Sequence, residues 1–302
     1  MSINQFTEDS YEQTLIDLFK RMGYQYECGY DVERDFREPW YVADLQQSLR
    51  KLNPKMSDEV LTEAYRIIIH VNEGTLEQRN EQMTDYLQNG VEVKYVADGR
   101  NQTALVKLID FAKPLHNDFK VCNQWRVVEK DKIRCDMVVF VNGLPLVVIE
   151  LKSPSNDNVE EDDAYLQIKQ YQQKCPALFV FNAFSVISDM STSKAGTLTA
   201  KQNRFMEWKS KDGSHVSTEA IDYETFFEGI FRKERLIDIL QNFLCFDHKD
   251  GRTVKIMTAY HQYFAVNKAL VKTGKAIGGD GKIGVFWHTQ GSGKSLSMVF
   301  YV

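Results

Sequence analysis

The sequence lacks the features that mark membrane, secreted and zinc-binding proteins. None of its apolar runs approaches the ~18 residues of a transmembrane helix, and its first ten residues are polar and acidic, unlike a signal peptide. The five cysteines, at positions 28, 122, 135, 175 and 245, are scattered and lack CxxC spacing, and the six histidines form no cluster. This pattern argues against a disulfide framework and a zinc site. We therefore expect reduced thiols, no membrane partner and a cytoplasmic location.

Composition and charge bound the class of protein without identifying a partner. With 302 residues, 43% of them apolar and 26% charged, the chain should fold as one large or two modest globular domains. The net charge of −5 does not favour nucleic acid, but nucleic-acid binding depends on a local basic surface. Two groups of basic residues could provide one, although a solvated face is the favoured interpretation of each. The groups are Arg126, Lys130, Lys132 and Arg134, and Lys194, Lys201, Arg204, Lys209 and Lys211.

What the sequence does contain is a charged motif inside an apolar segment. Residues 134–154 read as two apolar strands around an Asn-Gly turn. Asp136, Glu150 and Lys152 interrupt them, and unpaired charges buried in such a sheet would cost roughly several kcal/mol. A divalent cation between the carboxylates, with the ammonium beside a phosphate, would satisfy all three charges. This Asp…Glu-x-Lys pattern is typical of metal-dependent nucleases; the alternative is a surface salt bridge on an edge strand.

The chemistry of such a site explains the residue types. Mg²⁺ prefers hard oxygen ligands, which the carboxylates of Asp136 and Glu150 and the carbonyl of Leu151 could supply. The metal would activate a water and neutralise charge on the phosphate oxygens. Lys152 follows Glu150 by two residues and shares its strand face, where it could orient the water or stabilise the transition state.

The turn between the two strands decides whether the carboxylates can share one cation. A two-residue turn at 142–143 with uninterrupted strands would point them to opposite faces of the sheet. A common site therefore requires an odd loop or a bulge. We predict a three-residue loop over 141–143, with Gly143 at positive φ and Phe140 paired with Leu144. Both carboxylates would then reach one cation at ~2.0–2.6 Å.

A second functional motif lies near residue 302. Residues 282–287 resemble a strand, and an apolar run after residue 295 resembles the start of a helix. The sequence between them matches the end of a phosphate-binding P-loop, although His288 replaces the first glycine of the motif. In such a loop the glycines admit the phosphates, the lysine contacts them and the serine binds Mg²⁺; the alternative is a glycine-rich turn with an incidental lysine. The loop residues are Gly291, Ser292, Gly293, Lys294 and Ser295.

The chain ends seven residues after the P-loop serine. We therefore expect a fragment of a longer protein that does not hydrolyse ATP productively by itself. We also expect residues 288–293 to be poorly ordered or empty of nucleotide, because the surrounding motor is missing.

The remaining sequence predicts a domain at 1–246, containing a helical insert at 41–88, followed by a second domain at 247–302. The helix expected over 157–174 places Gln167 and Tyr171 on one face, where they could contact DNA phosphate or brace the metal ligands; an incidental polar stripe is the alternative. The other expected helices are 9–22 (capped by Ser10 and stopped by Gly23), 41–51, 57–71, 75–88 and 223–244. The other expected strands are 91–95, 104–111, 119–125, 177–181 and 184–188, with a loop over 190–204.

Taken together, the motifs resemble the restriction (R) subunit of type I restriction–modification enzymes. The resemblance spans roughly residues 100–302, with the order and spacing of that family. The residues that carry it are Asn117, Asn123-Gln124, Arg134-Cys-Asp136, Phe140 to Lys152, Gln167, Tyr171, Ala195-Gly-Thr197, Trp208, Tyr260-His-Gln-Tyr263 and Trp287 to Ser295.

The resemblance implies an α/β fold: a PD-(D/E)xK restriction-endonuclease-like mixed sheet flanked by helices, followed by the first strand and helix of a RecA-like motor. The catalytic trio would be Asp136, Glu150 and Lys152, with Cys135 in place of the signature proline. Gln167 and Tyr171 would form the QxxxY element, and Glu12 would be a helical acid near the metal. Residues 288–295 would be motif I of a superfamily-2 translocase, and Gln262 would contact adenine.

The function implied is Mg²⁺-dependent cleavage of double-stranded DNA, coupled in the full-length protein to ATP-driven translocation. Methylation (M) and specificity (S) subunits would be the partners, so this chain would cut without reading sequence itself. The main alternative is a non-catalytic module that docks DNA or a subunit. A nuclease–helicase of another system, such as repair, is a weaker alternative.

Overall fold

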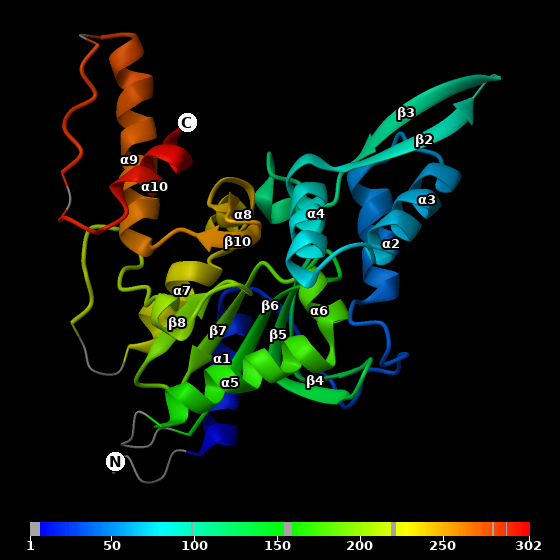
Figure 1. Cartoon of the computed structure of the whole chain (residues 1–302), viewed down its shortest axis with the longest axis horizontal. Helices are drawn as coiled ribbons and strands as arrows, with labels where there is room; N and C mark the ends of the chain where they lie inside the picture. Colours follow the sequence, from blue (N-terminus) through cyan, green and yellow to red (C-terminus); the bar gives the residue numbers. More distant parts are fainter. Residues whose placement is uncertain (1–6, 98, 154–158, 219–221, 280, 288) are drawn as a thin grey trace.

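A six-stranded mixed sheet forms the centre of the computed structural model (Figure 1). The structure describes residues 7–97, 99–153, 159–218, 222–279, 281–287 and 289–302, and only the backbone of 159–162. The strand order is β1-β4-β5-β6-β7-β8, in which β1 is parallel to β4 and β7 to β6, and the other neighbours are antiparallel. The strands are β1 (Gln25–Cys28), β4 (Phe119–Val128), β5 (Lys132–Val141), β6 (Leu144–Leu151), β7 (Phe184–Ser188) and β8 (Ser193–Gly196).

Helices cover both faces of this sheet. α1 (Glu8–Arg21) packs against β1 and β4, whereas α5 (Val159–Lys174) packs against β5, β6 and β7. The buried core divides in the same way, because Leu15 of α1 and Ile168 of α5 belong to separate apolar clusters. The prediction of a mixed α/β sheet flanked by helices is confirmed. Three further helices complete the layers: α6 (Pro176–Val180), α7 (Tyr223–Phe231) and α8 (Lys233–Asn242).

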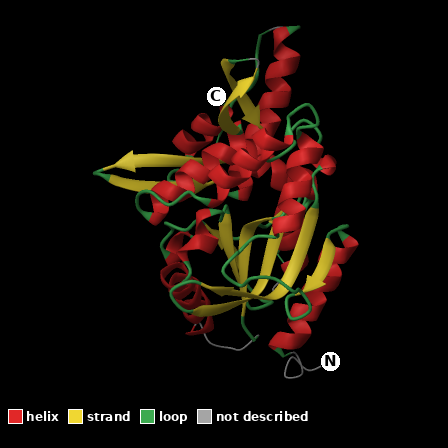
Figure 2. Cartoon of the chain, turned by 90° about the vertical axis from the view of Figure 1, so that its right-hand side faces the viewer, coloured by secondary structure: helices red, strands yellow, loops and turns green. Residues whose placement is uncertain are grey.

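The predicted helical insert is present as three helices followed by a hairpin. Ser57 and Thr75 cap the second and third helices by accepting hydrogen bonds from backbone amides. The hairpin projects away from the rest of the molecule (Figures 1 and 2). These elements are α2 (Val42–Leu52), α3 (Asp58–Ile69), α4 (Leu76–Asn89), β2 (Val91–Ala97) and β3 (Arg100–Val106).

The last part of the chain forms a hairpin and two helices: β9 (Leu244–Lys249), β10 (Arg252–Met257), α9 (Tyr260–Ile277) and α10 (Lys294–Tyr301). The predicted division between residues 246 and 247 falls within β9. The helix expected after the P-loop is confirmed, but the strand expected over 282–287 is absent. A strand needs a neighbour that pairs with its backbone, and these residues join no sheet of the described chain.

Several predicted boundaries are wrong. Residues 177–181 fall in α6 and the residue after it rather than in a strand: a five-residue apolar run is ambiguous, and Pro176 favours the first position of a helix. The loop expected over 190–204 contains β8, whose Ser-Lys-Ala-Gly sequence has no strand pattern but pairs with the edge of β7. The helix expected over 223–244 breaks at Arg232, whose ψ is 123°.

Two further boundaries shift by a few residues. The strand expected over 104–111 begins at Arg100 and ends at Val106. Helix α1 is capped by Thr7 rather than Ser10, and the two side chains exchange hydrogen bonds with each other's backbone as a capping box. Short 3₁₀ helices occur at Pro114–His116 and Gln202–Arg204. No helix of the described residues is long and apolar enough to cross a membrane.

Candidate active site

The turn between β5 and β6 differs from the predicted three-residue loop. Asn142 and Gly143 have φ angles of 53° and 81° and form a two-residue turn, so that Val141 pairs with Leu144. Asn and Gly tolerate positive φ better than other residues, which favours this hairpin. The Asn142 side chain is also fixed, because its amide donates to the carbonyl of Leu108 at 2.8 Å.

The odd residue that the sequence argument requires lies within β6. Phe140 pairs with Pro145, whereas Val139 pairs with Val147, so that Leu146 has no partner on β5. Proline cannot donate a hydrogen bond to a neighbouring strand, which suits Pro145 to a bulge. An odd residue between the two acids is therefore present, as the sequence predicts. It lies within β6, and the predicted place in the turn is wrong.

Beyond this bulge, the register brings the two acids together. Met137 pairs with Ile149, and the same register places Asp136 opposite Glu150. Residues directly opposite each other on antiparallel strands share a face of the sheet. The amide of Leu151 donates to Asp136 Oδ2 at 2.8 Å and fixes this carboxylate where the two strands separate.

Both carboxyl groups are harder to ionise than usual. Burial raises the pKa of Asp136 to about 6, although the hydrogen bond from Leu151 opposes this shift. Burial, followed by repulsion from Asp136, raises the pKa of Glu150 to about 8, and Lys152 opposes it. A cation between the two groups would remove the repulsion and favour the ionised forms.

Glu150 has a free oxygen atom that fits such a cation. The residue is 2% exposed, and its Oε1 accepts a hydrogen bond from Lys152 Nζ at 2.7 Å. Its Oε2 is buried and accepts no hydrogen bond of ordinary geometry from the described residues, although the Tyr171 hydroxyl lies close enough to oppose the rise in the pKa of Glu150. No group of three or more His, Cys, Asp or Glu side chains within those residues is arranged to hold a metal. A metal held by Asp136 and Glu150 would therefore need backbone or water ligands, and Mg²⁺ usually keeps several waters.

Helix α5 places the predicted Gln167 and Tyr171 behind the same strands. The Tyr171 hydroxyl donates to the carbonyl of Arg134 at 2.8 Å, two residues before Asp136. Burial raises the pKa of Tyr171, and the nearby charge of Glu150 adds to the shift, whereas a hydrogen bond with Gln167 opposes it. The helix thus braces β5 next to the paired acids.

Helix α1 brings Glu12 to the other side of the site. Its carboxylate accepts hydrogen bonds from Asn123 Nδ2 at 2.7 Å and Gln124 Nε2 at 2.6 Å. The charges of Glu8 and Glu12 both raise the pKa of Asp136, after the larger effects of burial and the Leu151 amide. Glu12 therefore lies near the pair, bound to two amides.

Sequence reasoning gave no role to Glu8, Asn123 or Gln124. Gln124 has a φ of 52° and interrupts the pairing of β4 with β5, between Asn123 and Trp125. A non-glycine residue at positive φ is uncommon and often marks a functional site. Asn123-Gln124 is among the residues that carry the family resemblance, but the alternation of a strand does not reveal such a distortion.

The predicted P-loop residues are distant in sequence from these acids. They form the loop before α10 and its first two residues, Lys294 and Ser295. Gly291 and Gly293 have φ angles of 81° and 77°, and Lys294 Nζ donates to the carbonyl of Thr289 at 3.1 Å. The structure describes residues 289–293, whereas His288 lies outside the described residues. The expectation that 288–293 are poorly ordered or empty of nucleotide stays a prediction. Ser295 is exposed.

Gln262 contacts this loop rather than facing an open adenine site. Its Oε1 accepts from the amide of Ala259 at 2.9 Å, and its Nε2 donates to the carbonyls of Ser292 and Gly293 at 3.3 and 3.1 Å. The residue is 4% exposed. Gln262 thus links the start of α9 to the loop before α10.

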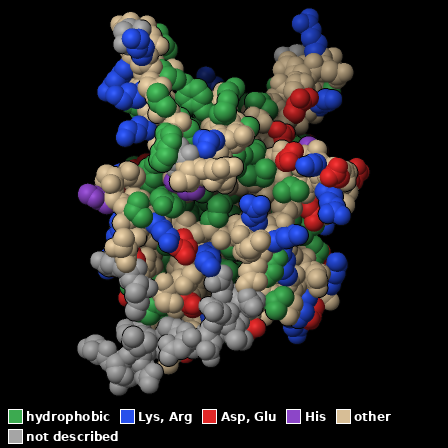
Figure 3. All heavy atoms as spheres, turned by 60° about the vertical axis from the view of Figure 1, so that its left-hand side comes forward, with side chains coloured by type: hydrophobic (Ala, Val, Ile, Leu, Met, Phe, Trp, Pro, Cys, Tyr) green, Lys and Arg blue, Asp and Glu red, His purple; other side chains and the backbone are tan. Residues whose placement is uncertain are grey.

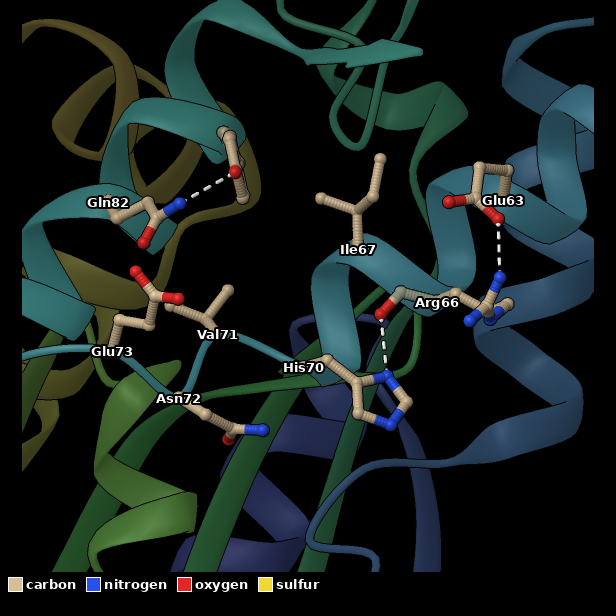
Figure 4. A pocket seen from close by; sticks show the side chains of 9 residues that line it. Glu63, Arg66, Ile67, His70, Val71, Asn72, Glu73 and Gln82 are labelled. Atoms are coloured by element: carbon tan, nitrogen blue, oxygen red, sulfur yellow. Dashed lines mark hydrogen bonds and ion pairs between the residues drawn. The ribbon is translucent and has the colours of Figure 1, made fainter. Parts of the chain in front are cut away.

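A pocket of about 450 Å³ lies elsewhere, between α3 and α4 of the insert (Figure 4). Its charged groups are already paired in part: Arg66 bonds Glu63 at 2.9 Å, and His70 Nδ1 lies 2.8 Å from the carbonyl of Arg66. The pocket shares no lining residue with the site around Asp136 and Glu150. It gives the insert no chemical role.

Known proteins similar to the chain place this site in a family. Residues 5–204 match the family model described as "Type I restriction enzyme R protein N terminus", and residues 261–302 match that of the "SWI2/SNF2 ATPase". The chain is 34% identical, over 97% of its length, to the type I restriction enzyme HindI endonuclease subunit of Haemophilus influenzae. It is 30% identical, over 96% of its length, to the putative type I restriction enzyme MjaIXP endonuclease subunit of Methanocaldococcus jannaschii.

A third relative, the type I restriction enzyme SauCOLORF180P endonuclease subunit of Staphylococcus aureus, is 31% identical over 60% of the chain. The chain spans only 29% and 30% of the length of the first two relatives. Its two matched regions follow the order expected from the motifs, with the paired acids in the first and the P-loop in the second. The chain belongs to the family of type I restriction enzyme R proteins, and corresponds to their N-terminal region and the start of their ATPase.

Proposed function

We propose that residues 1–246 form a Mg²⁺-dependent DNA endonuclease domain of the PD-(D/E)xK type, which cleaves phosphodiester bonds. The observation that carries the proposal is the opposed pair Asp136 and Glu150 with its buried, unpartnered Glu150 oxygen. A buried polar atom without a partner costs about 1–3 kcal/mol, and a cation at this atom would offset that cost. A site that binds a cation accounts for it.

In this mechanism, Asp136 and Glu150 would hold the metal, and the Leu151 carbonyl would be a third protein ligand. The amide of Leu151 already fixes the Asp136 carboxylate. Bound Mg²⁺ would supply an activated water and neutralise charge on the phosphate. Tyr171 and Gln167 keep β5 in place from α5, and Glu12 orients the amides beside Asp136 from α1.

Lys152 would act on the phosphate rather than on the metal. Burial lowers the pKa of its ammonium, but attraction to Glu150 and Asp136 outweighs burial, and the pKa is raised. The group is therefore charged at neutral pH. Its bond to Glu150 keeps it beside the site, from which it can orient the attacking water or stabilise the transition state.

Residues 247–302 would begin a RecA-like motor domain that uses ATP in the full-length protein. Gly291, Ser292 and Gly293 would admit the phosphates, with Lys294 on their oxygens and Ser295 on Mg²⁺. Gln262 could contact adenine only after releasing the carbonyls that it now bonds. In the whole protein we expect M and S subunits to choose the site on double-stranded DNA.

A cleavage assay tests the proposal against a module that only docks DNA or a subunit. Supercoiled plasmid is incubated with the chain and Mg²⁺, with Glu150→Ala as the test variant and Glu63→Ala, in the pocket of the insert, as the matched control. We expect Mg²⁺-dependent nicking by the unaltered chain and the control, and none by Glu150→Ala. DNA binding without cutting by any of the three proteins would favour the docking module instead.

A further inference from the structure

Two arginines face each other on strands β4 and β5. Arg126 and Arg134 are direct partners in the antiparallel ladder, and both are exposed. The neighbouring Trp125, Val127 and Cys135 are fully buried in the cluster on the other face. Like charges directly opposite each other destabilise a sheet, so this pair requires an explanation.

No carboxylate neutralises these arginines within the described residues. Lys120, on the same strand β4, shows the contrast, since it pairs with Glu27 and Asp44 at 2.7 Å each. Arg126 and Arg134 form no such ion pair in that part of the chain. Their charges therefore stay available to an anion from outside.

A neutral side chain, Tyr30, holds both guanidinium groups. The guanidinium carbon of Arg126 lies 4.6 Å from the centre of the Tyr30 ring. The Tyr30 hydroxyl accepts a hydrogen bond from Arg134 Nη1 at 2.9 Å. A ring and a hydroxyl can orient two cations without cancelling their charge, which is the arrangement expected of a preformed anion site.

A chain of contacts connects this arginine pair to the candidate active site. The Tyr30 hydroxyl donates to Gln124 Oε1 at 3.5 Å, and Gln124 Nε2 donates to Glu12 at 2.6 Å. Glu12 in turn acts on the charge state of Asp136. The side chain of Gln124, at the distorted position of β4, thus links Glu12 to Tyr30.

We propose that Arg126 and Arg134, oriented by Tyr30, bind a phosphate of double-stranded DNA that flanks the phosphate at Asp136 and Glu150. The proposal rests on the nuclease function proposed above. A guanidinium group matches phosphate with two parallel hydrogen bonds, and the bound anion would relieve the repulsion between the arginines. Such contacts position DNA without reading its sequence, as expected of a chain that does not choose the recognition site.

Binding of duplex DNA at several salt concentrations, without divalent cation, tests this site separately from cleavage. Arg126→Ala and Arg134→Ala should each weaken binding equally for unrelated sequences. Each should also reduce the slope of log affinity against log salt by about 1, because one phosphate contact is lost. The matched control is Arg100→Ala, which removes an exposed arginine from the projecting hairpin and should leave affinity and slope unchanged.

Two conservative variants separate recognition from folding. Arg134→Lys keeps the charge and should largely restore the salt slope, and Tyr30→Phe should weaken binding less than Arg134→Ala because the ring beneath Arg126 remains. Unchanged binding by both arginine variants, equal losses in Arg100→Ala, or no DNA binding by the unaltered chain at low salt would each overturn the proposal. If the arginine variants behave as expected but Glu150→Ala still cuts, the nuclease assignment fails and the DNA site stands.

Discussion

Glu150 has a proposed role in the site that should lower the stability of the metal-free fold. Its carboxyl group is buried beside that of Asp136, and its pKa is raised to about 8. Because the unfolded chain has an ordinary carboxyl pKa, the folded chain holds more protons than the unfolded chain between about pH 4.5 and about pH 8. The stability of the metal-free protein should therefore fall across this range.

Glu150→Gln should remove this contribution. In the presence of EDTA, we expect the variant to lose less stability than the unaltered chain between pH 5 and pH 9, and to melt at a higher temperature at pH 9. Residual pH dependence from Asp136 should persist. Thermal unfolding followed at several pH values measures the difference, and identical pH profiles for the two proteins would contradict the burial of an ionisable Glu150.

Lys152→Ala should separate catalysis from metal binding. Lys152 bonds Glu150 but is not expected to be a ligand. Loss of its ammonium should reduce DNA cleavage by about 10²–10³-fold and leave the affinity for Mg²⁺ largely intact. Calorimetric titration with Mg²⁺ provides the comparison, and a parallel loss of metal affinity would rule out the role assigned to this lysine.

At the scale of elements, the bulge in β6 is the feature that makes the site possible. From the sequence we expected an odd residue between Asp136 and Glu150, but the sequence alone does not show where this residue lies. Asn142 and Gly143 form a two-residue turn, which their positive φ angles favour. The residue without a partner on β5 therefore lies further along β6, at Leu146, next to Pro145. Strongly periodic helices such as 57–71 and 75–88 were predictable. Segments whose structure depends on tertiary partners, such as α6 and β8, were not.

The residues of the candidate site also differ in whether the sequence alone predicts them. The sequence motif predicts Asp136, Glu150, Lys152 and the QxxxY pair, because the pattern depends on residue type and spacing alone. It does not reveal that Gln124 leaves the extended conformation or that Tyr30 lies between two arginines. Those contacts join residues that are distant in sequence.

Deletion of Leu146 tests whether the register, rather than the bend of the bulge, sets the site. Without Leu146, Val147 would follow Pro145 directly, so that Val139 would still pair with Val147 and Asp136 would still lie opposite Glu150. We therefore expect the folded deletion variant to retain metal binding and Mg²⁺-dependent cleavage. Loss of both activities, with the α/β content measured by circular dichroism unchanged, would show that the bend of the bulge is itself needed.

At the scale of the molecule, the second matched region, residues 261–302, leaves many apolar side chains exposed. Exposed apolar side chains gather on the face formed by α9, α10 and the segment between them (Figure 3). Val285 and Trp287 are 93% and 80% exposed. An exposed apolar patch marks a contact surface, and in the full-length R protein proposed above the rest of the motor would cover it.

A buried lysine connects this part of the chain to the insert. Lys255 of β10 donates to Asn80 Oδ1, Thr84 Oγ1 and the carbonyl of Asn182, at 2.9 to 3.1 Å. Burial lowers its pKa to about 7. The hairpin that leads into α9 is therefore fixed to α4 by polar contacts that a substitution would leave unpaired.

Hydrogen exchange should reveal this arrangement. Amides of α9 and α10 should exchange faster than those of β5 and β6, because few residues of these helices are buried. Lys255→Ala should accelerate exchange in α4, β10 and α9 and spare the central sheet. A uniform change across the whole chain would instead indicate one cooperative unit.

Titration with Mn²⁺ followed by electron paramagnetic resonance shows whether Asp136 and Glu150 share a single cation. We expect one site per chain in the unaltered protein and in Glu63→Ala, and loss of that site in both Asp136→Asn and Glu150→Gln. Binding that survives either substitution at the original affinity would contradict the shared site.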